Sequence, residues 1–113
     1  MATLTPNLKV IPSLAAAVAK DSQSLGLSVT ALVAVLVRND AIAPAELAQV
    51  PPEKYSRVVV QCSLRAEIRR LAKRGAARSQ LPTINAYIEA LLAARVKRGG
   101  PLLVLQSKTG AKL

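Results

Sequence analysis

The side chains best suited to chemistry in this sequence are its Arg and Lys residues, and they are distributed unevenly. The 113-residue chain has 16 basic and 6 acidic residues, a formal net charge of +10. Residues 1–50 hold three of each sign, so residues 51–113 carry the whole excess. An excess of this size predicts a polyanionic partner, either nucleic acid or an acidic membrane surface. The densest basic cluster consists of Arg65, Arg69, Arg70, Lys73, Arg74 and Arg78.

The residue types that are missing exclude several kinds of catalytic and metal site. The chain has no His and only one Cys, Cys62, so a Ser-His-Asp set, a Cys-His set and an internal disulfide are excluded. The six acidic residues show no paired spacing, and no G-x-x-x-x-G-K loop is present. We therefore expect a binding protein with no metal ion and no cofactor, not an enzyme. Cys62 is expected to be a small buried side chain in a reducing compartment.

The apolar content predicts a packed core and no membrane span. Hydrophobic residues make up 51% of the chain, but the longest nearly unbroken apolar run, Leu25 to Val37, has only 13 residues. A helix that crosses a bilayer needs about 20 such residues. We therefore expect this run to form a core helix.

Two halves of the sequence repeat one another. VIPSL (Val10 to Leu14) aligns with VQCSL (Val60 to Leu64) at an offset of 50, and LSVTALVAVLV, from Leu27, aligns with the segment from Pro82 at an offset of 55. In the second pair of segments the apolar residues recur at i, i+3, i+4, i+7 and i+8, which is typical of an amphipathic helix. The chain is therefore interpreted as one domain built from two repeats.

Each repeat is expected to hold a strand, a helix, a turn and a second helix. The repeats cover about residues 5–38 and 55–98, joined by a linker at 39–54 and followed by a tail at 99–113 whose role the sequence leaves open. The four expected helices cover about residues 12–25, 29–38, 63–77 and 84–97. Alternation along the strands assigns one face to the core, formed by Leu8, Val10, Val58 and Val60.

Two hydroxyl residues mark the start of the second helix in each repeat. Ser28 and Thr83 stand just before the two apolar stripes, where a side-chain oxygen can accept a hydrogen bond from an N–H of the first helical turn. We expect both to be N-caps. Tyr87, at a stripe position, is expected in the core.

The paired segments resemble the ribbon-helix-helix superfamily of MetJ, Arc and CopG. The resemblance is carried by LKVIPSL with LGLSVTALVAVLV, and by RVVVQCSL with LPTINAYIEALL. It implies a mainly α fold with a short two-stranded antiparallel ribbon, here as a tandem ribbon-helix-helix in one chain. Family members are intertwined homodimers, because one unit of about 45 residues cannot cover its own apolar face. With both units in one chain, the resemblance implies a monomer that acts as a pseudodimer.

The resemblance also implies binding of double-stranded DNA, with the ribbon in the major groove. The positions that match the base-facing residues of the family are Thr5, Asn7, Lys9, Tyr55, Arg57, Val59 and Gln61. The phosphate clamp of the family carries over to the N-termini of the second helices, at Ser28, Val29, Thr30, Thr83, Ile84 and Asn85. The basic cluster from Arg65 to Arg78 supplies candidate contacts with the DNA backbone.

The tandem layout and basic second half are similar to those of the accessory DNA-binding proteins encoded in VirC operons of T-DNA transfer systems. This implies a bacterial cytoplasmic protein that helps a relaxase or other transfer proteins process a T-DNA or plasmid strand. A transcriptional repressor or antitoxin of the same fold is one alternative. A basic protein-interaction module with a purely structural ribbon is another. The sequence leaves open the DNA site, the pathway and whether the chain is part of a longer protein.

Overall fold

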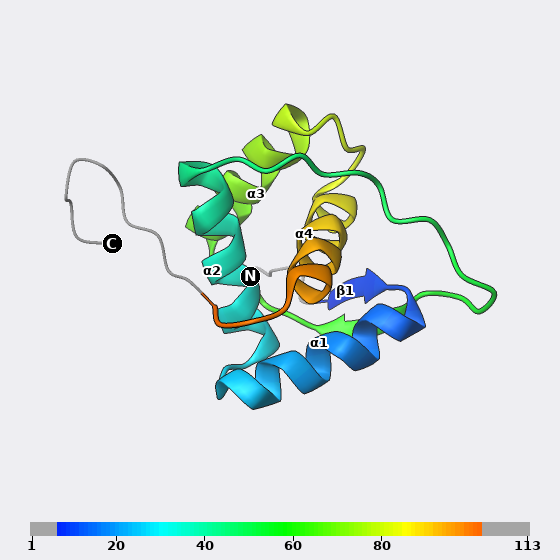
Figure 1. Ribbon diagram of the computed structural model, residues 1–113. Helices are drawn as coiled ribbons and strands as arrows, with labels where there is room; N and C mark the ends of the chain where they lie inside the picture. The colour runs from blue at the N-terminus through cyan, green and yellow to red at the C-terminus, as the bar shows by residue number, and fades with distance from the viewer. Residues whose placement is uncertain (1–6, 103–113) are drawn as a thin grey trace.

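Two strand-helix-helix units follow one another along the chain. The computed structural model describes residues 7–102. The elements, in order, are β1 (Asn7–Val10), α1 (Pro12–Leu25), α2 (Val29–Ile42), β2 (Val58–Gln61), α3 (Ala66–Arg78) and α4 (Ile84–Arg98) (Figure 1). The two strands form an antiparallel sheet. The expected mainly helical class with a two-stranded ribbon is therefore confirmed.

The ribbon has one buried face and one exposed face. Its register pairs Asn7 with Gln61, Leu8 with Val60, Lys9 with Val59, and Val10 with Val58. Leu8 and Val10 are buried, and Val60 packs half-buried against the core. Val58 differs from its prediction as a core residue, since it is 40% exposed. Its cross-strand partner Val10 is fully buried, and Val60 is likewise less buried than its partner Leu8, so β2 is the less covered strand of the ribbon.

The helix boundaries follow the capping signals. The Ser28 hydroxyl accepts a hydrogen bond from the Ala31 N–H at 3.1 Å, and the Thr83 hydroxyl accepts one from the Ala86 N–H at 3.0 Å. Gly26 ends α1 with φ at 71°, a left-handed conformation that suits glycine. Both predicted N-caps and this stop signal are confirmed.

Two boundaries differ from the prediction for a tertiary reason. The helix expected to end near Arg38 continues to Ile42, because Asp40 is buried on it and held by partners from other helices. The helix expected from Ser63 begins at Ala66. Residues 62–64 instead alternate between buried and exposed, and the Ser63 N–H donates to the Thr30 hydroxyl at 3.2 Å.

The core joins the two halves of the chain. α4 packs against α1 and β1 from the first half as well as against α3, and α2 packs against α3 (Figure 1). Every residue from Ala86 to Leu92 on α4 is buried. Neither half could keep this apolar surface from water alone, so the two units form one folded body.

Ion pairs with one buried partner tie helices of the two halves together. Asp40 on α2 accepts hydrogen bonds from the Tyr87 hydroxyl, at 2.5 Å, and from the Arg78 guanidinium, at 2.7 Å. On α1, Asp21 pairs with Arg95 of α4 through two hydrogen bonds of 2.9 and 3.0 Å. Tyr87 is fully buried, as predicted from its stripe position.

This arrangement predicts a loss of stability at alkaline pH. Burial and the hydrogen bond to Asp40 raise the pKa of Tyr87 above its ordinary value of 10.0. In the unfolded chain the phenol keeps its ordinary pKa and loses its proton more easily than in the folded protein. The free energy of unfolding is therefore unaffected below pH 10 and falls as pH rises above the pKa of the unfolded chain. Urea unfolding at about pH 8 and about pH 10.5 should show this fall. Tyr87→Phe should lower stability at the lower pH and flatten the fall. An equally steep fall in the variant would contradict the assignment.

Within residues 7–102, no single helix is both long and apolar enough to cross a membrane. α1 and α2 reach the required length and composition only as a pair, and they meet at an angle of 91°.

Candidate nucleic-acid interface

The outer face of the ribbon is open to solvent. Lys9 on β1 and Val59 on β2 are cross-strand neighbours on this face, and both are exposed, Val59 to 56%. Gln61 is exposed at the end of β2. Of the remaining predicted base-facing residues in the first strand, Thr5 lies outside the described residues, and only the strand backbone of Asn7 is described. The described part of this face therefore offers a cation, an apolar side chain and an amide.

Tyr55 lies outside the paired ribbon. It belongs to the segment that leads into β2, and it is 71% exposed. The Lys54 ammonium lies 5.7 Å from the centre of the Tyr55 ring, within the range of a cation–π contact. Tyr55 is therefore an exposed aromatic next to the ribbon, not a member of it.

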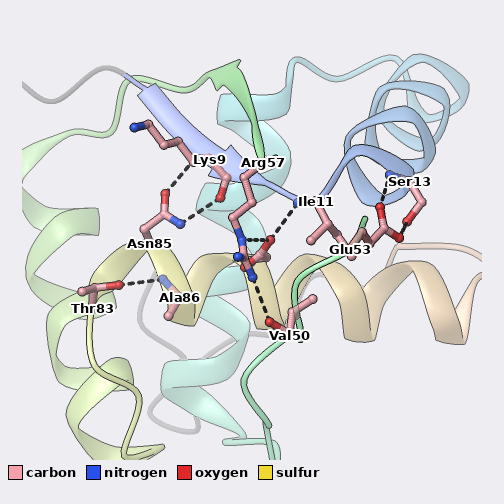
Figure 2. A network of polar contacts seen from close by, with 10 residues as sticks. Lys9, Ile11, Ser13, Val50, Glu53, Arg57, Thr83, Asn85 and Ala86 are labelled. Atoms are coloured by element: carbon pink, nitrogen blue, oxygen red, sulfur yellow. Dashed lines mark hydrogen bonds and ion pairs between the residues drawn. The ribbon is translucent and has the colours of Figure 1, made fainter. Parts of the chain in front are cut away.

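The N-terminus of α4 is joined to the free edge of β1. The Asn85 side chain accepts a hydrogen bond from the Lys9 N–H and donates one to the Lys9 carbonyl, both at 2.8 Å (Figure 2). Its amide thus replaces the backbone of a third strand and covers part of an edge that could otherwise pair with another chain. The side chain of Asn85 is therefore occupied, and its backbone N–H is what remains for a phosphate.

The N-terminus of α2 lies beside the segment that follows β2. The Thr30 hydroxyl accepts a hydrogen bond from the N–H of Ser63, two residues beyond β2. Together with the contact of Asn85 with Lys9, this places one helix N-terminus beside β1 and the other just beyond the end of β2.

The first turn of each of these helices leaves donors for an anion. Helix geometry provides no intrahelical acceptor for the earliest N–H groups, and each hydroxyl cap satisfies only one of them. The N–H groups left over belong to Val29, Thr30, Ile84 and Asn85. Because the helix dipole also favours negative charge there, each N-terminus can accept a phosphate.

Arg57 does not occupy the outward position predicted for it. Its Nε donates to both carboxylate oxygens of Glu89 on α4, at 3.1 and 3.0 Å, and its Nη2 donates to the Val50 carbonyl at 2.8 Å (Figure 2). The hydrogen bonds with Glu89 raise the pKa of Arg57 further. Glu89 is only 2% exposed and also accepts the Ile11 N–H at 2.9 Å. Arg57 therefore joins the linker and the ribbon to α4.

The basic cluster loses one of its six predicted members. Arg78 pairs with buried Asp40, so its guanidinium stabilises the fold. The other five side chains are exposed, and no acidic side chain among residues 7–102 forms an ion pair with Arg65, Arg69, Arg70, Lys73 or Arg74.

The acidic partners of the structural arginines were not predicted from the sequence. Glu89 stands inside an apolar run, AYIEALL, and a charge at a position that should be buried is the one signal that could have identified it. Asp40 and Asp21 carry no comparable signal. Cys62 is buried as expected, and burial raises the pKa of its thiol.

No set of three or more Cys, Asp or Glu side chains within the described range is placed to hold a metal ion. Comparisons with protein-family models, with curated proteins and with solved structures find no match to this chain.

Proposed function

We propose that this protein binds double-stranded DNA as a single-chain ribbon-helix-helix pseudodimer, with the ribbon in the major groove. The observation that carries the proposal is the position of two helix N-termini, that of α4 beside β1 and that of α2 just beyond the end of β2, next to a ribbon whose outer face is exposed. A two-stranded ribbon fits the major groove, and phosphates line both sides of that groove. The arrangement therefore offers side chains to base edges and N–H groups to the backbone.

The packing between the halves supports the pseudodimer. One strand comes from each half, and α4 packs on α1 and β1 of the other half. This is the intertwining expected if two ribbon-helix-helix units shared one core. We therefore expect the protein to be a monomer in sedimentation experiments.

The ribbon itself carries little charge, because Arg57 is occupied. Lys9 is then the cation in the described part of its outer face, and it can donate to a guanine edge or a phosphate. Val59 can contact the methyl group of a thymine. The two sides of the face therefore differ, which favours a DNA site without dyad symmetry.

A site of this kind suits an accessory factor for T-DNA or plasmid strand transfer in a bacterial cytoplasm, acting beside a relaxase or other transfer proteins. A repressor or antitoxin of the same fold that reads a palindromic operator is the alternative function. Selection of bound sequences from a random duplex library separates the two, since an operator reader should return an inverted repeat.

Lys9 provides the test of the ribbon. Its contacts with Asn85 use backbone atoms, so Lys9→Ala removes the ammonium and leaves those hydrogen bonds in place. We expect roughly tenfold weaker binding to a selected duplex in fluorescence anisotropy, about the effect of one base contact. Lys20→Ala, which removes the same charge at an exposed position of α1, is the control and should change affinity less than twofold.

The wild-type protein should also show log K falling with log salt at a slope of roughly −4 to −5 if it neutralises about four to six phosphates. A slope near zero, or equal effects of Lys9→Ala and Lys20→Ala, would remove the ribbon from the mechanism. The basic module that docks an acidic protein would then be the better interpretation.

A further inference from the structure

α1 and α3 occupy matching places in the two halves but differ sharply in charge. At the offset of 50, the exposed cations of α3 align with α1 positions that carry a single charge. In order, Arg65, Arg69, Arg70, Lys73 and Arg74 match Ala15, Ala19, Lys20, Gln23 and Ser24. Four of the five α1 residues are exposed and Ala15 is half-buried, so they too lie away from the core.

The fold does not require these five exposed cations, whereas Arg78, at the end of the same helix, pairs with Asp40. α1 is one residue longer and forms the same kind of helix with Ala, Gln and Ser at these positions. α3 is held to α2 and α4 by Ile68, Ala72 and Ala76 on its opposite side. Clustered cations also repel one another across the helix surface, which costs stability. Cations clustered on one helix can, however, bind an anion.

Arg69, one of these cations, lies beside the N-terminus of α4 at the proposed DNA-binding face. Arg69 lines a hollow of about 130 Å³ together with Leu8 of β1 and with Ile84 and Asn85 at the N-terminus of α4. Asn85 in turn holds the backbone of Lys9. Arg69 and Lys9 therefore lie beside the same helix N-terminus.

The repeat places no cation at the positions that match Arg69 and Lys9. The residues that match Arg69 and Lys9 in the repeat are Ala19 and Val59. The N-terminus of α2 consequently has no equivalent cations from the repeat, although its N–H groups are the same.

We propose that α3 binds the sugar-phosphate backbone of duplex DNA that flanks the ribbon site on the α4 side only, so that the protein occupies DNA in one orientation. This inference rests on the proposed DNA binding. Four of the five cations are Arg, whose planar guanidinium can donate two parallel hydrogen bonds to a phosphate. The sugar-phosphate backbone is favoured over an acidic protein because Arg69 lies beside a helix N-terminus that can itself bind phosphate.

The test exchanges α3 residues for those of α1. Arg69→Ala with Lys73→Gln places the α1 residues on α3, and Lys97→Gln with Arg98→Gln removes two exposed charges at the far end of α4. Binding to a selected duplex of about two helical turns is measured from low to high salt. Each lost phosphate contact removes about 0.9 from the slope of log K against log salt, so the α3 variant should lose roughly 1.8 and the control almost nothing. Thermal melting of both variants confirms that they are folded.

Hydroxyl-radical footprinting of the same duplex tests the orientation. The wild-type protein should protect backbone farther on one side of its site, and the α3 variant should lose that extension alone. Equal slopes for the wild type and the α3 variant, or a symmetric wild-type footprint, would overturn the inference.

If the wild type binds DNA and Lys9→Ala weakens that binding, DNA binding through the ribbon stands even when the α3 inference fails. Loss of binding to poly-glutamate in the α3 variant, with DNA affinity unchanged, would assign α3 to an acidic protein.

Discussion

Replacing Gly75 with Ala should destabilise the protein by about 3 kcal/mol, although Ala is normally the better helix former by about 1 kcal/mol. A Cβ on Gly75 would overlap Cζ and the hydroxyl oxygen of Tyr87. The Tyr87 ring is fully buried and cannot move aside without breaking its hydrogen bond to Asp40. The loss of stability therefore combines steric strain in the core with the cost of a buried Tyr87 hydroxyl that has lost its hydrogen bond. Thermal unfolding should show Tm lowered by more than about 10 °C.

The other repeat suggests a second substitution that should restore part of the stability lost in Gly75→Ala. In the first half, Leu25 stands at the position of Gly75 and Leu32 at the position of Tyr87. The larger residue at the first position is thus combined with a smaller one at the second. The double variant Gly75→Ala with Tyr87→Leu should lose less stability than the sum of the losses in the two single variants, by at least about 1.5 kcal/mol. Additive effects would show that the steric contact is not the cause of the loss. Ala77→Gly, at an exposed position of the same helix, should cost only about 1 kcal/mol.

Glu89→Ala should cost about 3 kcal/mol, the second large effect. The change leaves the Arg57 guanidinium half-buried without its counter-ion and the Ile11 N–H without its acceptor, and it opens a cavity in the core. Loss of one partner of a buried ion pair costs about 3–5 kcal/mol, and Arg57 keeps 30% of its side chain exposed, which lowers the expected figure. Urea unfolding measures the loss, and Glu89→Gln should recover part of it by still accepting the Ile11 N–H.

Two comparisons make this prediction specific. In a double-mutant cycle, the losses from Arg57→Ala and Glu89→Ala should not be additive, because both changes remove the same ion pair. Glu67→Ala breaks an exposed ion pair with Arg38, whose atoms are 3.7 Å apart, and should cost less than about 0.5 kcal/mol. Equal losses for Glu67→Ala and Glu89→Ala would show that burial of the pair has no energetic role.

The position of Arg57 changes how DNA-binding variants should be interpreted. A loss of affinity in Arg57→Ala would reflect a loosened ribbon as well as any lost contact, because Arg57 joins Glu89 to the Val50 carbonyl. Lys9 and the five exposed cations of the basic cluster, Arg65, Arg69, Arg70, Lys73 and Arg74, form no ion pairs within the described residues. They are therefore the positions at which affinity and stability can be separated.

The sequence by itself determined the order of the elements, both hydroxyl caps and the uneven charge. Periodicity and capping depend on residues within one or two helical turns of each other, so they can be identified without knowledge of the fold. The internal repeat likewise identified the two units, and the resemblance to ribbon-helix-helix proteins implied that their strands pair. The charge difference between α1 and α3 required only the alignment of the halves.

Only the tertiary structure decided which cations remain available to a partner. Arg57, Arg78 and Arg95 bind carboxylates that are 32, 38 and 74 residues away in the chain. Nothing local distinguishes Arg78 from its neighbours on α3. A carboxylate buried by packing must have a partner that lies within reach, and packing of the two halves brings Asp40 to Arg78 and Glu89 to Arg57. The sequence therefore predicted a basic second half, while the fold assigned part of that charge to stability and left Lys9 and five cations of α3 exposed.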